Sequence, residues 1–582
     1  MECLSEASNV DYDVVICGAG LAGLTLARQI TKEIPEASLL LIEGTGDKSR
    51  KAALKVGEST IEISAHYLAD ILGLRAYLEA SHFHKHGLRF FFGAGSDAFQ
   101  DRPEVGISRP PAIDSYQLER GILEADLKSM NAAMDIRMLA ESRVEDIVLA
   151  DGPGLHEITL MQGSGMQCQT VRSRWVVDAT GRRRFLQKKL GLAEPQNPRY
   201  SAAWFRLEGR IDVCDLVPLT ETDWHERVPG GKRYYSTNHL MGNGRWVWLI
   251  PLASGCTSIG IVAQEDIFPF AEYNSYERAL CWLEKHEPAL RNLIGTRQPV
   301  DFQCMRHYNY SAKQVFSFQR WACTGDAAVF ADPFFSPGID QIGFANTIIT
   351  EMIKQDRAGK LEPKTVDVLN TTFLNFHTGV TWITHNGYPF FGDSLVMGTK
   401  LIWDVARGFA LNGPQRFNRI YLDEQLTERL QPFLSRIFLL TLRMEKLFKE
   451  WASRTQRKYS YQFVDYFTIP GMKELYLRNL RANKTVNELL TDHQMTVDYL
   501  EELVQIIFLL ALADVMPEAF AQLPSPLWLN AWGIGLDPKR WKADKLFTPS
   551  SKPRPLKLAQ FASFFGVADL PCLVPVLEPR RG

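Results

Sequence analysis

The stretch Tyr12-Asp-Val-Val-Ile-Cys-Gly-Ala-Gly-Leu-Ala-Gly23 decides how this chain folds. Its first half is an apolar run typical of a buried parallel strand, and three glycines with G-x-G-x-x-G spacing follow at once. A helical pattern continues to about Thr31, and a second apolar run from Ala37 to Ile42 ends at Glu43. Strand, glycine turn, helix and strand in this order predict a βαβ unit that binds a dinucleotide.

The three glycines and the acid each have a role in such a unit. Gly18 allows the tight turn, Gly20 lets the backbone approach a pyrophosphate, and Gly23 lets helix and strand pack closely. Glu43 is expected to bond a ribose 2′-hydroxyl, which favours an adenosine without a 2′-phosphate. A glycine turn that holds no ligand is the alternative, and the complete strand, helix and acid context argues against it.

The overall composition is that of an ordinary globular protein. The chain has 582 residues, enough for several domain-sized units, with 46% hydrophobic and 23% charged residues. A net charge of −2 gives no basic face, so no nucleic-acid partner is predicted. Apolar runs such as Leu503 to Ala513 are too short to cross a bilayer, so no membrane segment is predicted either.

The cysteines and the N-terminal segment bear on the compartment. The nine cysteines are scattered, none falls in a C-x-x-C pair, and an odd number argues against a disulfide framework. The segment from Met1 to Asp13 is acidic and polar, unlike a signal peptide. A reducing, cytoplasmic setting is therefore expected.

Two later stretches predict further contacts to the nucleotide. Val176-Val-Asp-Ala-Thr-Gly181 ends a strand in an Ala-Thr-Gly turn, and Gly325-Asp326 follows the β-like run from Gln319 to Thr324. An apolar helical pattern from Ile342 to Ile353 comes next. This order places backbone N–H groups and a helix N-terminus where a phosphate or another anion can bind.

The order of these motifs resembles that of the flavoprotein monooxygenases. In that class the Ala-Thr-Gly turn and the Gly325-Asp326 turn match the second and third FAD contacts, and Arg120 matches an arginine near the pyrophosphate. A surface pair of Arg120 with Glu119 is the alternative. Only one nucleotide fingerprint is present, with no second Rossmann unit for NAD(P)H visible. FAD is therefore the expected cofactor, reduced elsewhere and delivered as FADH2.

Three further motifs narrow the class of flavoprotein. They are Val56-Gly-Glu-Ser-Thr60, Gly244-Arg-Trp-Val-Trp-Leu-Ile-Pro251, and Asp332-Pro-Phe-Phe-Ser-Pro-Gly338. Together with the fingerprint they resemble the two-component flavin-dependent halogenases. The second motif, W-x-W-x-I-P, is the most specific, because ordinary flavin hydroxylases lack it. Strand alternation puts Trp246 and Trp248 on one face, and the family places this pair between the substrate and the flavin.

The resemblance implies a reaction and an architecture. Members of the family use FADH2, oxygen and chloride or bromide to form hypohalous acid, which a lysine delivers to an electron-rich carbon. The expected α/β fold has an FAD-binding Rossmann-like domain (1–200 and 300–355), an interleaved sheet on the substrate side (200–300) and a helical C-terminal cap (356–582). Alternating runs such as Arg233 to Asn238 predict strands of that sheet. The expected partner is a separate flavin reductase.

Lys85 is the predicted catalytic lysine. It follows the Gly-Glu-Ser-Thr motif at the start of an apolar run, where the family lysine falls, and Lys55 is the alternative. A delivering lysine needs a partly buried position, which lowers its pKa. His82, His84 and His86 alternate around Lys85 and would share one face of a strand. No acids or cysteines accompany them, so no metal site is predicted.

The Ser-Pro-Gly segment carries the predicted halide site. Ser336 matches the family serine that positions hypohalous acid beside the lysine, and Gly338 matches the glycine whose N–H holds the halide. Pro337 has no N–H, so either Gly338 and Ile339 suffice or halide binding is weak or lost. Phe335 stands where tryptophan-specific halogenases carry Glu, which points to the phenol, pyrrole or aliphatic branch.

The motifs favour an FADH2-dependent halogenase of a small electron-rich aromatic, with a phenol as the expected substrate and a place in secondary metabolite biosynthesis. An FAD-dependent monooxygenase without a halide site is one alternative, supported by Pro337 and opposed by the tryptophan pair. A flavoprotein without catalysis that binds a partner through its cap is another. The basic stretch from Arg436 to Lys458 is either a solvated face or a docking face for an acidic carrier protein that bears the substrate.

Overall fold

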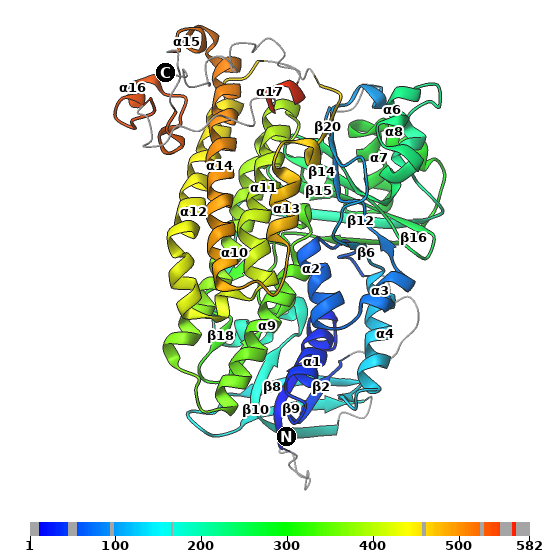
Figure 1. Cartoon of the computed structure of the whole chain (residues 1–582). Coiled ribbons are helices and arrows are strands. Elements are labelled where there is room, and N and C mark those ends of the chain that lie inside the picture. Colours follow the sequence, from blue (N-terminus) through cyan, green and yellow to red (C-terminus); the bar gives the residue numbers. More distant parts are fainter. Residues whose placement is uncertain are drawn as a thin grey trace.

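The described part of the chain folds mainly into two eight-stranded sheets and a group of long helices (Figure 1). This computed structural model describes residues 11–44, 55–93, 98–163, 167–456, 461–523, 529–547 and 561–565. The first sheet lies low in the view of Figure 1 near the N-terminus, the second lies at the upper right, and the long helices stand side by side on the left. The predicted mixed α/β class is confirmed.

The first sheet has the topology expected of a dinucleotide-binding unit. At its centre β1 (Asp11–Cys17) pairs in parallel with β2 (Leu39–Ile42) and with β10 (Gln167–Asp178). β2 continues in parallel to β7 (Arg137–Leu139), and β10 continues to β19 (Trp321–Cys323). The carboxyl ends of parallel strands meet at one edge of a sheet. The three turns that the sequence singled out therefore lie together.

Two helices pack on this sheet and start at its ligand-facing edge. α1 (Leu21–Glu33) follows the glycine turn, and α9 (Gly338–Arg357) follows the Ser-Pro-Gly segment. The side chain of Asn346 on α9 donates to the Ala22 carbonyl at 3.1 Å, which ties the two helices together. The helical pattern predicted from Ile342 lies inside α9, and the helix begins earlier because Pro337 already has a helical φ of −79°.

The second sheet is larger than the segment predicted for it. Its strands come from three separate parts of the chain, and the division into domains by residue number stays a prediction. In order across the sheet they are β16 (Pro299–Met305), β12 (Tyr200–Glu208), β15 (Cys256–Gln264), β14 (Arg245–Pro251), β13 (Thr237–Gly242), β4 (Leu88–Phe91), β5 (Glu104–Gly106) and β20 (Phe463–Asp465).

The strand predicted from Arg233 to Asn238 is wrong over most of its length. The chain forms a 3-10 turn over Pro229–Tyr235, in which Gly230 and Gly231 have positive φ, and β13 begins only at Thr237. Arg233 turns into the core instead of alternating across the sheet, because its guanidinium pairs with the buried Glu104 carboxylate at 2.9 Å. A buried ion pair has overridden the local strand pattern.

The two faces of the second sheet have different coverings. Trp204, Trp246 and Trp248 lie on one face and pack in a core shared with the long helices. Val247 and Leu249 lie on the opposite face, in a separate core with the helices α7 (Tyr276–His286) and α8 (Pro288–Ile294). The predicted alternation of β14 is confirmed, with both tryptophans on the helical side.

The C-terminal half supplies the helical cap. Its main helices are α10 (Pro363–Gly387), α11 (Ser394–Phe417), α12 (Glu424–Ala452), α13 (Met472–Asn479) and α14 (Val486–Val515). The predicted basic stretch covers the end of α12, and its last residues, Arg457 and Lys458, lie outside the described residues. None of the helices in the described ranges has both the length and the apolar character that a bilayer crossing requires.

Candidate active site

A cavity of about 250 Å³ lies where the glycine turns meet the tryptophan face of the second sheet. We call it the glycine-rich cavity. The residues that line it include Gly20, Gly57, Ser59, Arg120, Ala179, Gly181, His239, Trp246, Trp248, Gly325, Asp326, Ser336, Pro337, Gly338 and Ile339. The fingerprint, the Ala-Thr-Gly turn, the Gly-Asp turn and the Ser-Pro-Gly segment thus share one cavity.

The three fingerprint glycines have different environments. A methyl group at Gly18 would lie 2.2 Å from the Ala179 carbonyl oxygen, and one at Gly23 would lie 1.9 Å from the Gly18 carbonyl oxygen. A methyl group at Gly20 would meet no atom within 4 Å. Gly18 and Gly23 therefore serve close packing, whereas Gly20 leaves its backbone open to the cavity. This arrangement fits a bound dinucleotide.

Arg120 lies at the cavity wall and not on the outer surface. Its side chain is 17% exposed and pairs with the Glu124 carboxylate at 2.6 Å, while a second guanidinium nitrogen donates to the Val56 carbonyl at 3.1 Å. The alternative pairing with Glu119 is wrong, because the Glu119 carboxylate accepts the backbone N–H of Ser254. These bonds hold the guanidinium in the cavity wall, and an arginine held there can bind a phosphate.

The two predicted acids occupy different places. Asp326 lines the glycine-rich cavity, and burial raises the pKa of its carboxyl while Arg120 opposes the shift. Glu43 follows the last residue of β2, and its carboxylate lies 3.2 Å from the ammonium of Lys128. Both positions are the strand ends at which the motifs predict nucleotide contacts.

The Ser-Pro-Gly segment forms the N-terminus of α9. Ser336 has a left-handed φ of 54°, and the Pro337 carbonyl accepts the Gln341 N–H at 2.9 Å. The first N–H groups of a helix have no partner within it, so those of Gly338 and Ile339 are available at the cavity wall. A methyl group at Gly338 would meet nothing within 4 Å. Pro337 removes one N–H from this set.

The tryptophan pair forms a wall of the same cavity. The ring centroids of Trp246 and Trp248 are 5.8 Å apart, and both side chains are buried. The Trp246 indole N–H donates to the Tyr388 hydroxyl at 3.0 Å, which in turn donates to the Asp332 carboxylate at 2.6 Å. Burial raises the pKa of Asp332 to about 6. These bonds tie the Trp246 ring to the turn between α10 and α11, whereas the Trp248 indole N–H donates to the Ser258 hydroxyl of the sheet at 3.2 Å.

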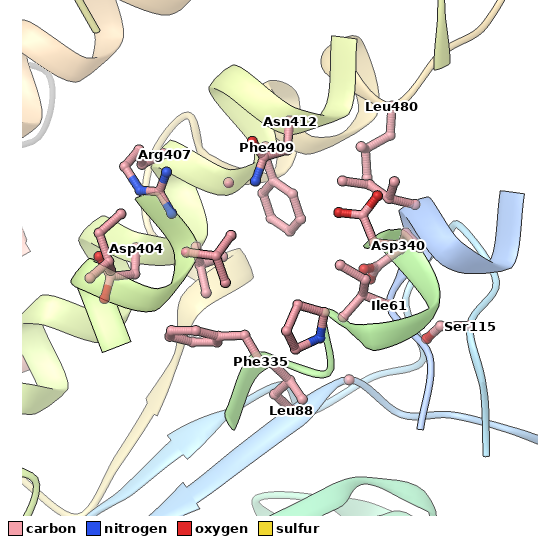
Figure 2. Close-up of a pocket in the computed structure, with 18 of the residues that line it drawn as sticks. Ile61, Leu88, Ser115, Phe335, Asp340, Asp404, Arg407, Phe409, Asn412 and Leu480 are labelled. Atoms are coloured by element: carbon pink, nitrogen blue, oxygen red, sulfur yellow. The ribbon is translucent and has the colours of Figure 1, made fainter. Parts of the chain in front are cut away.

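A second, smaller cavity lies between the second sheet and the cap helices (Figure 2). We call it the lysine cavity, and its volume is about 120 Å³. Figure 2 shows Arg407 and Phe409 of α11 on one side and Phe335 and Leu88 on the other. A cavity of about 150 Å³ in another protein binds benzene, so this volume suits a single aromatic ring.

Lys85 lies in the wall of the lysine cavity and is only 2% exposed. Its ammonium donates to the Ser59 hydroxyl at 2.8 Å and to the Thr60 carbonyl at 2.6 Å. Burial lowers the pKa of Lys85 to about 7, and the nearby Glu62 carboxylate opposes the shift. Lys85 therefore has the burial and the lowered pKa that a delivering lysine needs.

Lys55 and the flanking histidines have other surroundings. The Lys55 side chain is 46% exposed and pairs with Glu124. β3 covers only Phe83–His84, so the predicted three-histidine face does not form: His82 is the buried C-cap of α3 (Arg75–Ser81), and His84 lies near the surface with Asp114 at 3.5 Å. Over the described ranges, no cluster of three or more His, Cys, Asp or Glu side chains is arranged to hold a metal ion.

Lys85 and Ser336 are brought to neighbouring cavities and not to one. Ser336 lines the glycine-rich cavity, Lys85 lines the lysine cavity, and Pro337 lines both. The hydrogen bond from Lys85 to Ser59 crosses the same boundary, because Ser59 lines the glycine-rich cavity. The two cavities therefore meet at Pro337 and at the hydrogen bond between Lys85 and Ser59.

Sequence reasoning missed three residues of the lysine cavity: Glu62, Asp404 and Arg407. Glu62 follows the Gly-Glu-Ser-Thr motif closely, and that proximity is a signal that could have found it. Asp404 and Arg407 lie on α11, far along the chain, where the sequence shows only an apolar helix with scattered charges.

The sequence is similar to characterised halogenases. It is 29% identical to the flavin-dependent halogenase chlA of Dictyostelium discoideum over 371 residues, 59% of this chain and 60% of that protein. It is 25% identical to a 1H-pyrrole-2-carbonyl-[peptidyl-carrier protein] chlorinase of Pseudomonas fluorescens, over 57% of this chain and 73% of that protein. The match thus spans less than two thirds of the Dictyostelium relative's length. No protein-family profile matches the chain.

Solved structures share the fold. The halogenase PltM in complex with phloroglucinol and FAD superposes with a TM-score of 0.59 at 17% identity, covering 88% of this chain and 98% of that one. The flavin-dependent brominase Bmp2 superposes with a TM-score of 0.52 at 23% identity, covering 66% of this chain and 90% of that one. The chain thus carries the fingerprint and the W-x-W-x-I-P strand, is similar in sequence to flavin-dependent halogenases over somewhat less than two thirds of its length, and shares its fold with solved flavin-dependent halogenases.

Proposed function

We propose that this protein is a flavin-dependent halogenase that transfers chlorine or bromine to a small electron-rich aromatic. The observation that carries the proposal is the position of Lys85. Its buried ammonium lies between a cavity with the features of a dinucleotide site and a cavity of the size of one aromatic ring. The sequence similarity to flavin-dependent halogenases supports the same conclusion.

The glycine-rich cavity fits FAD. The residues expected to hold it are Gly20 at the pyrophosphate and Arg120 and Asp326 further along. Gly18 and Gly23 would shape the turn around it, and Glu43 is expected at a ribose. Reduced FAD would supply two electrons that bring oxygen to the peroxide level, at which it can oxidise a halide. Because a single dinucleotide fingerprint is present in the sequence, a separate flavin reductase is the proposed source of FADH2.

The N-terminus of α9 is the proposed halide site. The unpaired N–H groups and the positive end of the helix macrodipole attract an anion there. Gly338 and Ile339 supply the donors, and the open space beside Gly338 leaves room for a chloride or bromide ion. Pro337 leaves this site one donor short, so we expect it to bind halide weakly.

Lys85 is the proposed delivering group, with Ser336 as the residue that positions hypohalous acid on the glycine-rich side. With a pKa of about 7 the amine is neutral in part of the molecules near neutral pH, and it can then accept as well as donate a hydrogen bond. Trp246 and Trp248 line the glycine-rich cavity and not the lysine cavity, in which the aromatic ring is proposed to bind.

The proposed substrate is a phenol or another electron-rich ring. Phe335 lines the lysine cavity, and an apolar ring in place of a glutamate suits an aromatic better than it suits the ammonium of an amino acid. One relative acts, by its name, on a pyrrole carried by a peptidyl-carrier protein. Delivery by a carrier protein is therefore the alternative to a free substrate.

A monooxygenase without a halide site is the second candidate, and Pro337 is the observation that favours it. One experiment separates the two. The protein is supplied with FAD, a flavin reductase, NADH, oxygen, chloride or bromide, and a panel of phenols and pyrroles, and products are analysed by mass spectrometry. A halide-dependent isotope pair supports the halogenase. A gain of one oxygen that is independent of halide establishes the monooxygenase.

A further inference from the structure

Arg407 differs from the other buried arginines of the described chain. It is 9% exposed, yet it forms no hydrogen bond or ion pair with any described residue, and its Nε is buried without a partner. Each of the other arginines of equal or lower exposure has a carboxylate or carbonyl partner: Arg89, Arg102, Arg206, Arg233, Arg245, Arg320 and Arg416. A buried charge without a partner is costly.

The two neighbouring acids both bond to one other cation, Lys400. Asp404 accepts from the Lys400 ammonium at 3.0 and 3.2 Å, and Glu445 also pairs with Lys400. Their charges act on Arg407 from a distance, but neither carboxylate bonds to it. Its guanidinium therefore keeps its donors for another group.

The other two acids that line the lysine cavity also lie near a basic residue. Asp340 pairs with Arg416 at 3.3 Å, and Glu62 lies close enough to Lys85 for each charge to act on the other's pKa. Among the described residues, Arg407 is thus the basic residue lining the lysine cavity that has no hydrogen-bond or ion-pair partner. Figure 2 shows it on the same side as Phe409, with Phe335 across the cavity.

We propose that Arg407 binds a carboxylate of the substrate, so that the ring halogenated in the lysine cavity belongs to a free aromatic acid. This inference rests on the proposed halogenase function and adds the substrate class. The guanidinium fork matches a carboxylate through two parallel hydrogen bonds. A doubly charged phosphate fits less well, because Asp340, Asp404 and Glu62 line the same cavity.

The proposal fixes how the ring lies. Lys85 comes from the loop between β3 and β4, and Arg407 comes from the cap helix α11. A cavity of about 120 Å³ holds little beyond one ring, so a carboxylate at Arg407 leaves the ring as the part that can reach Lys85. A carrier thioester consumes the carboxylate, and a substrate delivered in that form would leave Arg407 unmatched.

The test is a binding measurement that needs no turnover. Calorimetry of the full chain, without reductant, compares 2,4-dihydroxybenzoate with its methyl ester, which has the same ring and no charge. The variants are Arg407→Gln, which removes the charge, and Arg407→Lys, which keeps the charge but loses the fork. Arg443→Gln, on α12 and outside the cavity lining, is the matched control for loss of one positive charge.

The acid should bind the parent protein at least about tenfold more tightly than its ester, as a charge-assisted bidentate pair implies. Arg407→Gln should remove that preference and leave ester binding within about twofold, and Arg407→Lys should keep part of it. Arg443→Gln should change neither affinity. Thermal unfolding of each variant checks that the fold is intact.

Three results would overturn the proposal. They are equal binding of acid and ester, equal weakening of both by Arg407→Gln, and no binding of benzoate, 4-hydroxybenzoate or 2,4-dihydroxybenzoate. The second would mean that Arg407 only balances the Lys400, Asp404 and Glu445 charges. The binding measurement contains no flavin or halide, so its result does not depend on whether the protein halogenates. A failure to bind the acid would refute the role of Arg407, and a failure to halogenate would refute the proposed function.

Discussion

The Lys85 ammonium lies 2.8 Å from the Ser59 hydroxyl, and this one hydrogen bond joins the walls of two cavities. Ser59 in turn lies 2.8 Å from the Thr237 hydroxyl on β13, which anchors it to the second sheet. The lysine is therefore held in place from the side on which the flavin is proposed to bind.

Replacing Lys85 should abolish halogenation and spare flavin binding. Lys85→Ala removes the only lysine that lines either cavity among the described residues. Loss of a positioned proton-transferring group costs about a hundredfold or more in rate. Product formation is followed by mass spectrometry, and FAD binding by fluorescence. Lys55→Ala, at the exposed alternative lysine, is the control. Full halogenation by Lys85→Ala would exclude Lys85 as the delivering residue.

Restoring the missing N–H at Pro337 should strengthen halide binding. Both Pro337→Thr and Pro337→Ala add a backbone donor beside Gly338, and the φ of −79° suits either residue. A hydrogen bond to a charged group contributes about 1.5–3 kcal/mol, so the chloride KM should fall about tenfold or more. A fall in Pro337→Thr alone would assign the gain to the hydroxyl. An unchanged KM in both variants would refute the missing-donor explanation.

The fingerprint glycines should separate into a packing class and a ligand class. Gly23→Ala forces a methyl group against a backbone carbonyl 1.9 Å away, so we expect a loss of about 1–3 kcal/mol in the free energy of unfolding. Gly20→Val points into open space with extended φ and ψ, and should change that free energy by less than about 1 kcal/mol. FAD affinity should nevertheless fall in Gly20→Val. Unchanged flavin binding there would place the pyrophosphate elsewhere.

Lys85 should also give the protein a distinctive dependence of stability on pH. Its pKa is about 7 in the folded chain and has an ordinary value of 10.5. Between these values the unfolded chain holds a proton that the folded chain releases, so stability rises with pH across this window. Below about pH 7 both states are protonated and the effect is constant.

The comparison with Lys85→Met isolates that effect. Urea unfolding at several pH values between 7 and 9.5 should show the parent protein gaining stability relative to Lys85→Met as pH rises. A difference in free energy of unfolding that stays constant over this range would mean that burial does not lower the pKa of Lys85.

Local patterns in the sequence were enough to predict the nucleotide end. The Gly18–Gly23 turn, β1 and α1 follow from neighbouring residues, because glycine spacing and apolar period are local properties. Lys85 could be predicted because it follows a recognisable motif. The residues that the cap contributes to the site could not be predicted in this way. Arg407 matters only because Lys400 holds both Asp404 and Glu445, and tertiary packing alone decides that.

The errors have a similar cause. The alternating run at Arg233 indicates a strand, but the buried Glu104 carboxylate draws its guanidinium inward. The histidines around Lys85 alternate in sequence, yet the strand ends at His84. His82 is therefore buried at the end of α3, whereas His84 lies near the surface. In both places a long-range charge or a chain reversal overrides a short-range period.

β20 has a consequence for engineering. This short strand, Phe463–Asp465, comes from the cap and pairs with β5, and the Asp465 carboxylate accepts the Ser108 N–H at 2.9 Å. The cap thus contributes an edge strand to the sheet that it covers. In a chimera that takes everything after residue 356 from a relative, β20 would come from the relative and its partner β5 from this protein. Swaps intended to change substrate preference should therefore keep β20 and its partner strand from the same parent.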